Sequence, residues 1–201
     1  MMKMKSALLL LAVLVLAVAP DGARADIALI DKETLNGGFE QETLKPWFGA
    51  SDFPGCSIES GTGIALEGKQ CCRLRLEAKK SQRAVARLFS NLTNVNPAQG
   101  HYFTVKLNVA GVASHPGMAI GGELIFTDDK AVAKSVSIQG WPGTSSTAWA
   151  QIELPMTGEV PTDWSGGKVQ FRLVFYVDHG VPGDIHELLI DNVTLVQKEK
   201  P

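Results

Sequence analysis

Alternation of apolar and polar residues, repeated in separate short stretches, is the feature that most limits what this chain can fold into. Residues 101–110 give the clearest example, because every second side chain there is apolar. Those apolar residues are Phe103, Val105, Leu107 and Val109. Neighbouring side chains of a β-strand point to opposite faces of the sheet, so this spacing predicts a strand with one buried face. Residues 169–177 repeat the pattern with bulky inward side chains.

The same alternation predicts about eight to ten short strands, separated by turns rich in Gly, Pro and Asn. We expect them at residues 26–35, 70–77, 82–92, 101–110, 121–127, 131–138, 148–154, 169–177 and 188–196. Residues 82–92 could instead form an amphipathic helix. Residues 41–63 are expected to be an irregular loop with Trp47 and Phe48 tucked inward. The sequence therefore predicts an all-β fold, a sandwich of two antiparallel sheets.

Residues 1–25 have the organisation of a signal peptide. Two lysines precede an apolar run over residues 7–19, and residues 23–25 form a small-x-small cleavage site. The run is shorter than the roughly 20 apolar residues that a membrane span needs, and no later stretch approaches that length. We therefore expect a cleaved leader and one mature domain over residues 26–201, secreted or periplasmic. An uncleaved anchoring helix is the alternative.

The charge of the chain excludes one class of partner. Its formal net charge is −2, and its longest basic run is the pair Lys79 and Lys80. A nucleic-acid-binding surface needs clustered cations, so we expect no nucleic-acid partner.

Three cysteines, Cys56, Cys71 and Cys72, allow at most one internal bridge and leave a spare thiol. Cys72 has the parity of the inward residues of its strand, and Cys71 that of the outward residues. A bridge from Cys56 to either of them is open. A zinc site is not expected, because the spacing gives neither Cys-x-x-Cys nor a nearby His pair.

The two ends of the predicted domain each bring one carboxylate to an apolar strand. Residues 35–47 open with a predicted turn over residues 36–38, in which Gly can take positive φ without cost and Asn tolerates it. Phe39 then offers a ring to the core and Glu40 a carboxylate. Residues 188–196 form an apolar closing strand whose single acid is Asp191.

These end motifs resemble those of carbohydrate-binding modules of the four/nine type, which are galactose-binding-domain-like jelly rolls. The resemblance rests on residues 36–40, Trp47, the middle strand at residues 102–109, the strand with Trp149, and residues 190–193, and it extends over nearly the whole mature chain. It implies that the first and last strands lie side by side. It also implies a sugar chain on one open sheet face, and a structural calcium between the two ends. Glu40 and Asp191 match the positions that would meet this calcium.

The outward positions of the predicted strands supply the candidate sugar site. Sugar-binding pockets combine aromatic rings with a few polar side chains that fix orientation. The candidates are Tyr102, Lys106, Asn108, Glu123, Arg172, Tyr176 and, from a loop, Trp141.

No arrangement of residues in the sequence predicts catalysis. The four histidines are scattered, no Gly-x-Ser-x-Gly occurs, and no phosphate-cradling loop is present. We therefore expect a secreted non-catalytic protein that binds a glycan or polysaccharide. An exported structural or protein-interaction β-sandwich without a sugar ligand is the alternative, with an extracellular or envelope protein as its partner.

Overall fold

The computed structural model describes residues 26–51, 56–61, 63–77, 84–93, 95, 102–113, 118–127, 132–140, 148–156, 166–177 and 183–198. Within these ranges the chain forms eleven strands and one short 3-10 turn, η1 (Thr34–Asn36). The predicted signal peptide lies outside the described residues. No helix in the described ranges is long and apolar enough to cross a membrane.

The first sheet, here called sheet A, has six strands in the order β3-β4-β11-β6-β9, with β1 also paired to β11. Its strands are β1 (Ile27–Ile30), β3 (Cys56–Ser60), β4 (Gln70–Glu77), β6 (Tyr102–Ala113), β9 (Ala150–Met156) and β11 (Ile185–Lys198). All of its pairings are antiparallel.

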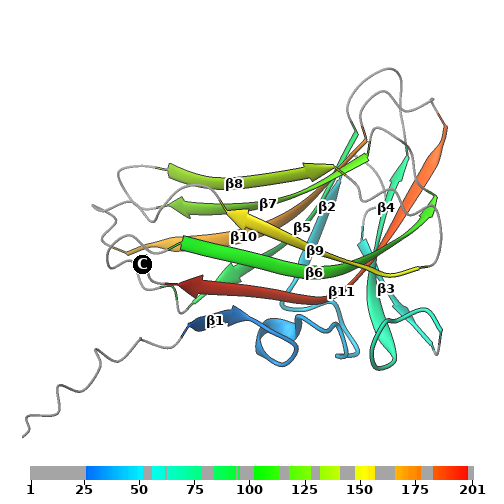
Figure 1. The fold of residues 1–201 in the computed structure, drawn as a ribbon, viewed down its shortest axis with the longest axis horizontal. Helices are drawn as coiled ribbons and strands as arrows, with labels where there is room; N and C mark the ends of the chain where they lie inside the picture. The colour runs from blue at the N-terminus through cyan, green and yellow to red at the C-terminus, as the bar shows by residue number, and fades with distance from the viewer. Residues whose placement is uncertain are drawn as a thin grey trace, which may run out of the picture.

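The second sheet, sheet B, has five strands in the order β2-β5-β10-β7-β8 and is also antiparallel. They are β2 (Phe48–Ser51), β5 (Ala84–Leu92), β7 (Met118–Thr127), β8 (Val132–Gly140) and β10 (Lys168–Val177). Figure 1 shows the two sheets as facing layers. This arrangement confirms the predicted all-β sandwich.

One hydrophobic core fills the space between the sheets. The inward stripe of β6 is fully buried there, as its alternation predicts, and the stripe of β10 packs against it. Aromatic contacts bind the core together: Phe103 of sheet A lies 5.9 Å from Phe126 of sheet B, and the ring of Trp47, which precedes β2, meets that of Phe171 edge-on at 6.1 Å. Burying each such side chain contributes about 1.5–3 kcal/mol, so the two stripes supply much of the stability.

The two ends of the domain lie side by side, as the sequence predicts. Strand β1 pairs with β11, and a bulge in β11 turns the N–H of Val193 away from β6. That N–H donates to the carbonyl oxygen of Gly37 at 2.9 Å. Asn36 adopts the positive φ that the predicted turn allows it, at +52°. Gly37 has φ −64°, so the predicted reason for glycine was wrong, and the other positive φ values here fall on Leu35 and Phe39. Glycine is needed because a Cβ here would lie 2.3 Å from two backbone oxygens.

The expected loop at residues 41–63 was partly wrong. Strands β2 and β3 lie within it, one on each sheet. Trp47 is buried as predicted, but Phe48 is 46% exposed. Parity explains the difference, because neighbouring residues of an extended strand face opposite sides and Trp47 points to the core.

All three cysteines are free thiols, so the bridge that the sequence left open is not formed. Cys72 lies in the main core as predicted. Cys71 lies on the outer face of sheet A, yet it is buried beneath Ile64, Ala65 and Trp149. Burial raises the pKa of Cys56 and that of Cys71 to about 12.

Because thiolate is the reactive form, we expect no cysteine to react with a thiol reagent such as DTNB at pH 8 while the chain is folded. In denaturant all three should react. Titration in both conditions tests this. A single reactive thiol in denaturant would show that an internal bridge forms after all.

Candidate functional site

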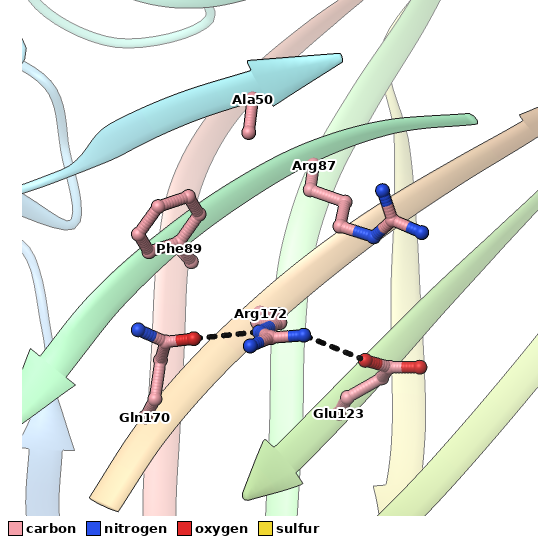
Figure 2. A pocket seen from close by; sticks show the side chains of 6 residues that line it. All are labelled: Ala50, Arg87, Phe89, Glu123, Gln170 and Arg172. Carbon is pink, nitrogen blue, oxygen red and sulfur yellow. Dashed lines mark hydrogen bonds and ion pairs between the residues drawn. The ribbon is translucent and has the colours of Figure 1, made fainter. Parts of the chain in front are cut away.

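A groove of about 410 Å³ lies on the outer face of sheet B. Its lining comes from four neighbouring strands and is shown in Figure 2. The lining residues are Ala50, Arg87, Phe89, Glu123, Gln170 and Arg172. We call this feature the sheet B groove.

Strand register explains why these residues share one face. Residues directly opposite each other in an antiparallel pair point to the same side. Phe48 of β2, Phe89 of β5, Arg172 of β10 and Glu123 of β7 are consecutive partners across the sheet. We call them the aromatic row, because it begins with two phenylalanines.

A second row, one strand repeat away, contains Ala50, Arg87, Val174 and Gly121. We call it the Arg87 row. Apart from the arginine, its members carry small or apolar side chains. Short side chains beside a long one leave open space above the strands, which accounts for the hollow.

Polar contacts run across the groove floor (Figure 2). The Nε of Arg172 donates to Oε1 of Gln170 at 2.6 Å, and its terminal nitrogen lies 3.9 Å from Oε2 of Glu123. The amide of Gln170 in turn donates to Asn91 at 3.2 Å. The side chain of Arg172 is therefore held in place from both sides before any ligand arrives.

An aromatic surface stands beside these polar groups. The rings of Phe48 and Phe89 are stacked, with centroids 5.6 Å apart and an interplanar angle of 24°. Phe48 is one of the few exposed large hydrophobic side chains in the described part of the chain. An apolar ring face next to oriented hydrogen-bonding groups suits a ligand with both apolar and polar surfaces, and a sugar ring is such a ligand.

The structure divides the predicted ligand residues between the two sheets. Glu123 and Arg172 line the sheet B groove, and Tyr176 lies further along β10 on the same face. Tyr102, Lys106 and Asn108 belong to β6 of sheet A, and their outward face is on the other side of the sandwich. The seventh candidate, Trp141, lies outside the described residues.

Lys106 is already paired with Glu153 at 3.3 Å on that other side. The predicted residues therefore do not form one site, although part of the set meets in the groove.

Four residues that line the groove were not predicted from the sequence: Ala50, Arg87, Phe89 and Gln170. Arg87, Phe89 and Gln170 have outward parity in their strands, so the signal was present and was not used. Phe48, which stacks on Phe89 at the groove edge, was assigned to a loop interior.

The predicted calcium ligands, Glu40 and Asp191, do meet the same segment of chain. Residues 66–70 fold over the outer face of sheet A, and Asp191 is fully buried beneath them. Its Oδ2 accepts the N–H groups of Leu66 and Glu67 at 3.0 and 3.1 Å. Glu40 accepts the N–H of Lys69 at 3.0 Å. We call this arrangement the carboxylate clasp.

Burying the charged carboxylate of Asp191 is unfavourable, and the hydrogen bonds of the carboxylate clasp compensate for part of that cost. Burial raises the pKa of its carboxyl, while the N–H groups of Glu67, Asn192 and Leu66 oppose the rise. Gly68 completes the clasp, because it adopts φ +73° and a Cβ there would collide with the carboxylate of Glu40.

The clasp does not have the donor set of a calcium cage. Calcium takes six to eight oxygen ligands, including backbone carbonyls. Here both carboxylates face N–H donors, and the described residues contain no group of three or more His, Cys, Asp or Glu able to hold a metal. The predicted calcium therefore stays a prediction.

Replacing Asp191 with asparagine is expected to lower the free energy of unfolding by about 2 kcal/mol, because a buried group would lose hydrogen bonds and gain a misplaced NH₂. Urea unfolding measures this. Glu153→Gln, which alters an exposed ion pair on the same sheet, should change stability by less than about 0.5 kcal/mol. Equal effects of the two changes would contradict the role of the clasp.

Comparison with solved structures identifies the fold. The CBM22-1 xylan-binding domain of Xyn10C from Paenibacillus barcinonensis superposes with a TM-score of 0.59 and 14% identity, over 89% of this chain and 99% of that one. TmCBM61, solved with β-1,4-galactotriose, gives a TM-score of 0.51 and 16% identity, over 80% and 94% of the two chains. No protein-family model and no curated protein sequence matches.

This chain therefore has the β-sandwich jelly-roll fold of carbohydrate-binding modules. A Stig cyclase, Fisc from Fischerella sp. TAU, is also similar, with a TM-score of 0.54 and 15% identity over 88% of this chain and 100% of that one. At these identities the likeness concerns the fold alone, because one fold can carry many different functions.

Proposed function

We propose that this protein is a non-catalytic glycan-binding module and that it holds its ligand in the sheet B groove. The observation that carries the proposal is the stacked pair Phe48 and Phe89 beside the oriented side chains of Gln170, Arg172 and Glu123. Aromatic rings can pack on the C–H faces of a sugar, while Arg, Gln and Glu bond its hydroxyl groups. Solved proteins of this fold include xylan-binding and galactotriose-bound modules, which supports the proposal.

The groove lining argues for binding rather than hydrolysis. Most glycosidases use two carboxyl groups flanking the scissile bond. Among the residues that line this groove, Glu123 is the single acid, and it lies close to Arg172. We therefore propose that the protein retains its glycan unchanged.

We further propose that the protein acts outside the cytoplasm. The predicted leader over residues 1–25 supports secretion or a periplasmic location. Cell-wall or extracellular polysaccharide would then be the accessible ligand.

Affinity electrophoresis through gels that contain different soluble polysaccharides tests the proposed function. We expect retardation by at least one polymer, and competition by short oligosaccharides released from it. No retardation by any polymer, with or without added calcium, would refute glycan binding. Capture of an envelope protein that sugar does not displace would then favour the protein-interaction alternative.

A further inference from the structure

The side chain of Arg87 is a cation in the groove that no carboxylate neutralises among the described residues. Its partners across the strands are Ala50 and Val174, and Gly121 follows in the same row. None of these can accept a hydrogen bond through a side chain. Arg87 nevertheless lines the groove and is only half-exposed. A partly buried arginine that no carboxylate of the described residues neutralises can bind an anion.

Arg172, the second arginine of the groove, does have side-chain partners. It bonds Gln170 and lies near Glu123, so its charge is partly balanced. The lining as a whole holds two guanidinium groups against one carboxylate. The ligand that best complements this lining carries negative charge near Arg87.

From this charge distribution we propose that the groove selects an acidic glycan, whose sugar rings carry a carboxylate or a sulfate. The inference rests on the proposed function, because it concerns the ligand class of the same site. Phe89 and Arg87 are two residues apart on β5 and share a face, roughly 7 Å along the strand. A sugar ring that packs on Phe89 would direct a charged substituent of the same or the next ring to Arg87.

The guanidinium suits such a group because its planar N–H donors match two oxygens of a carboxylate or a sulfate. A neutral glycan would instead leave the Arg87 cation half-desolvated without a compensating charge, which costs affinity. Because salt screens the attraction between Arg87 and an anion, the preference for charged over neutral glycans should weaken as the salt concentration rises.

Titration calorimetry with four probes tests the inference. They are polygalacturonate, the same polymer with its carboxyl groups reduced to alcohols, a sulfated galactan and a neutral galactan. We expect the charged polymers to bind roughly tenfold more tightly than their neutral counterparts at low salt. Tighter binding of polygalacturonate would identify the anion as a carboxylate, and tighter binding of sulfated galactan would identify it as a sulfate.

Two variants of Arg87 test whether the preference for charged polymers depends on this residue. Arg87→Gln should remove the roughly tenfold preference for charged polymers, while Arg87→Lys should keep part of it because the charge remains and the two-pronged geometry is lost. Lys106→Gln, on the opposite face, should leave the preference unchanged and serves as the control.

The outcomes separate the inference from the proposed function. Equal binding of the charged and neutral polymers, or a preference that survives Arg87→Gln, overturns the acidic-glycan assignment while glycan binding itself stands. Absence of binding to all four polymers, together with no retardation by any polysaccharide in the gels, overturns both.

Discussion

Replacing Phe89 with alanine is expected to weaken glycan binding about thirty-fold, equivalent to about 2 kcal/mol. The ring lines the groove and is stacked on Phe48, so alanine would remove the apolar surface and release its neighbour. Calorimetric titration of both proteins with the best-retained polymer measures the change. Phe89→Leu, which keeps apolar volume but loses the flat ring, should fall between the two.

Tyr102→Ala provides the matched control for this prediction. Tyr102 is also a partly exposed aromatic residue, but it lies on sheet A, away from the groove. We expect its loss to leave affinity unchanged within about twofold, since surface side chains outside an interface contribute little. If Tyr102→Ala weakened binding and Phe89→Ala did not, the site would lie on sheet A. Unfolding midpoints of both variants separate binding effects from misfolding.

Gly37→Ala is expected to destabilise the fold by about 3 kcal/mol or more, since a tightly packed site does not accept an added methyl group. The new Cβ would lie 2.3 Å from the carbonyl oxygens of both Asp31 and Val193. Backbone atoms cannot swing aside as a flexible side chain can, so the contact between the 36–40 turn and β11 must open. Urea unfolding monitored by tryptophan fluorescence measures the loss, since Trp47 packs beside this turn.

The neighbouring glycine tests whether crowding is the cause. A Cβ at Gly38 would lie 3.2 Å from Cγ of Lys32 and 3.4 Å from its backbone oxygen, contacts that a small shift of the Lys32 side chain can relieve. Gly38→Ala should therefore cost less than about 1 kcal/mol. A loss for Gly37→Ala no larger than that for Gly38→Ala would contradict the close packing of the two chain ends.

The alternation of apolar and polar residues predicted most of the fold. A strand with one buried face needs an apolar residue at every second position, so each such strand shows the pattern in its own sequence. Parity alone correctly placed inward the alternate apolar residues of β6 and β10, which are Phe103, Val105, Leu107 and Val109 and Val169, Phe171, Leu173 and Phe175. The pairing of the first and last strands was predicted from the end motifs, and β1 on β11 confirms it. The short strands β2 and β3 were missed. Strand β2 has four residues, Phe-Gly-Ala-Ser, which is too short to show a period.

The candidate site was predicted only in part. Alternation along a strand shows which residues point outward, but it does not show which of the two sheets the strand belongs to. Lys106 and Arg172 both point outward, yet they belong to different sheets of the sandwich. Sheet membership depends on which strands pair with each other across long stretches of sequence. The periodicity of a single strand does not predict its partners. Knowing that β5 and β10 are neighbours is what joins Phe89 to Arg172.

The carboxylate clasp shows that residue types alone do not predict a metal site. Two acids on strands that meet are compatible with a metal site, and the resemblance favoured one. Whether the crossing segment offers carbonyl oxygens or N–H groups depends on its backbone path. Residues 66–70 present N–H groups to Glu40 and Asp191.

Amide chemical-shift mapping is the most direct test of the central claim that the outer face of sheet B binds glycan. The ¹⁵N-labelled protein would be titrated with oligosaccharides of the polymer that binds most tightly. We predict that the largest shifts fall on β2, β5, β7 and β10 around Phe48, Arg87, Phe89 and Arg172, with little change around Lys106 and Glu153. Shifts centred on the outer face of β6 and β9, with the groove unaffected, would contradict it.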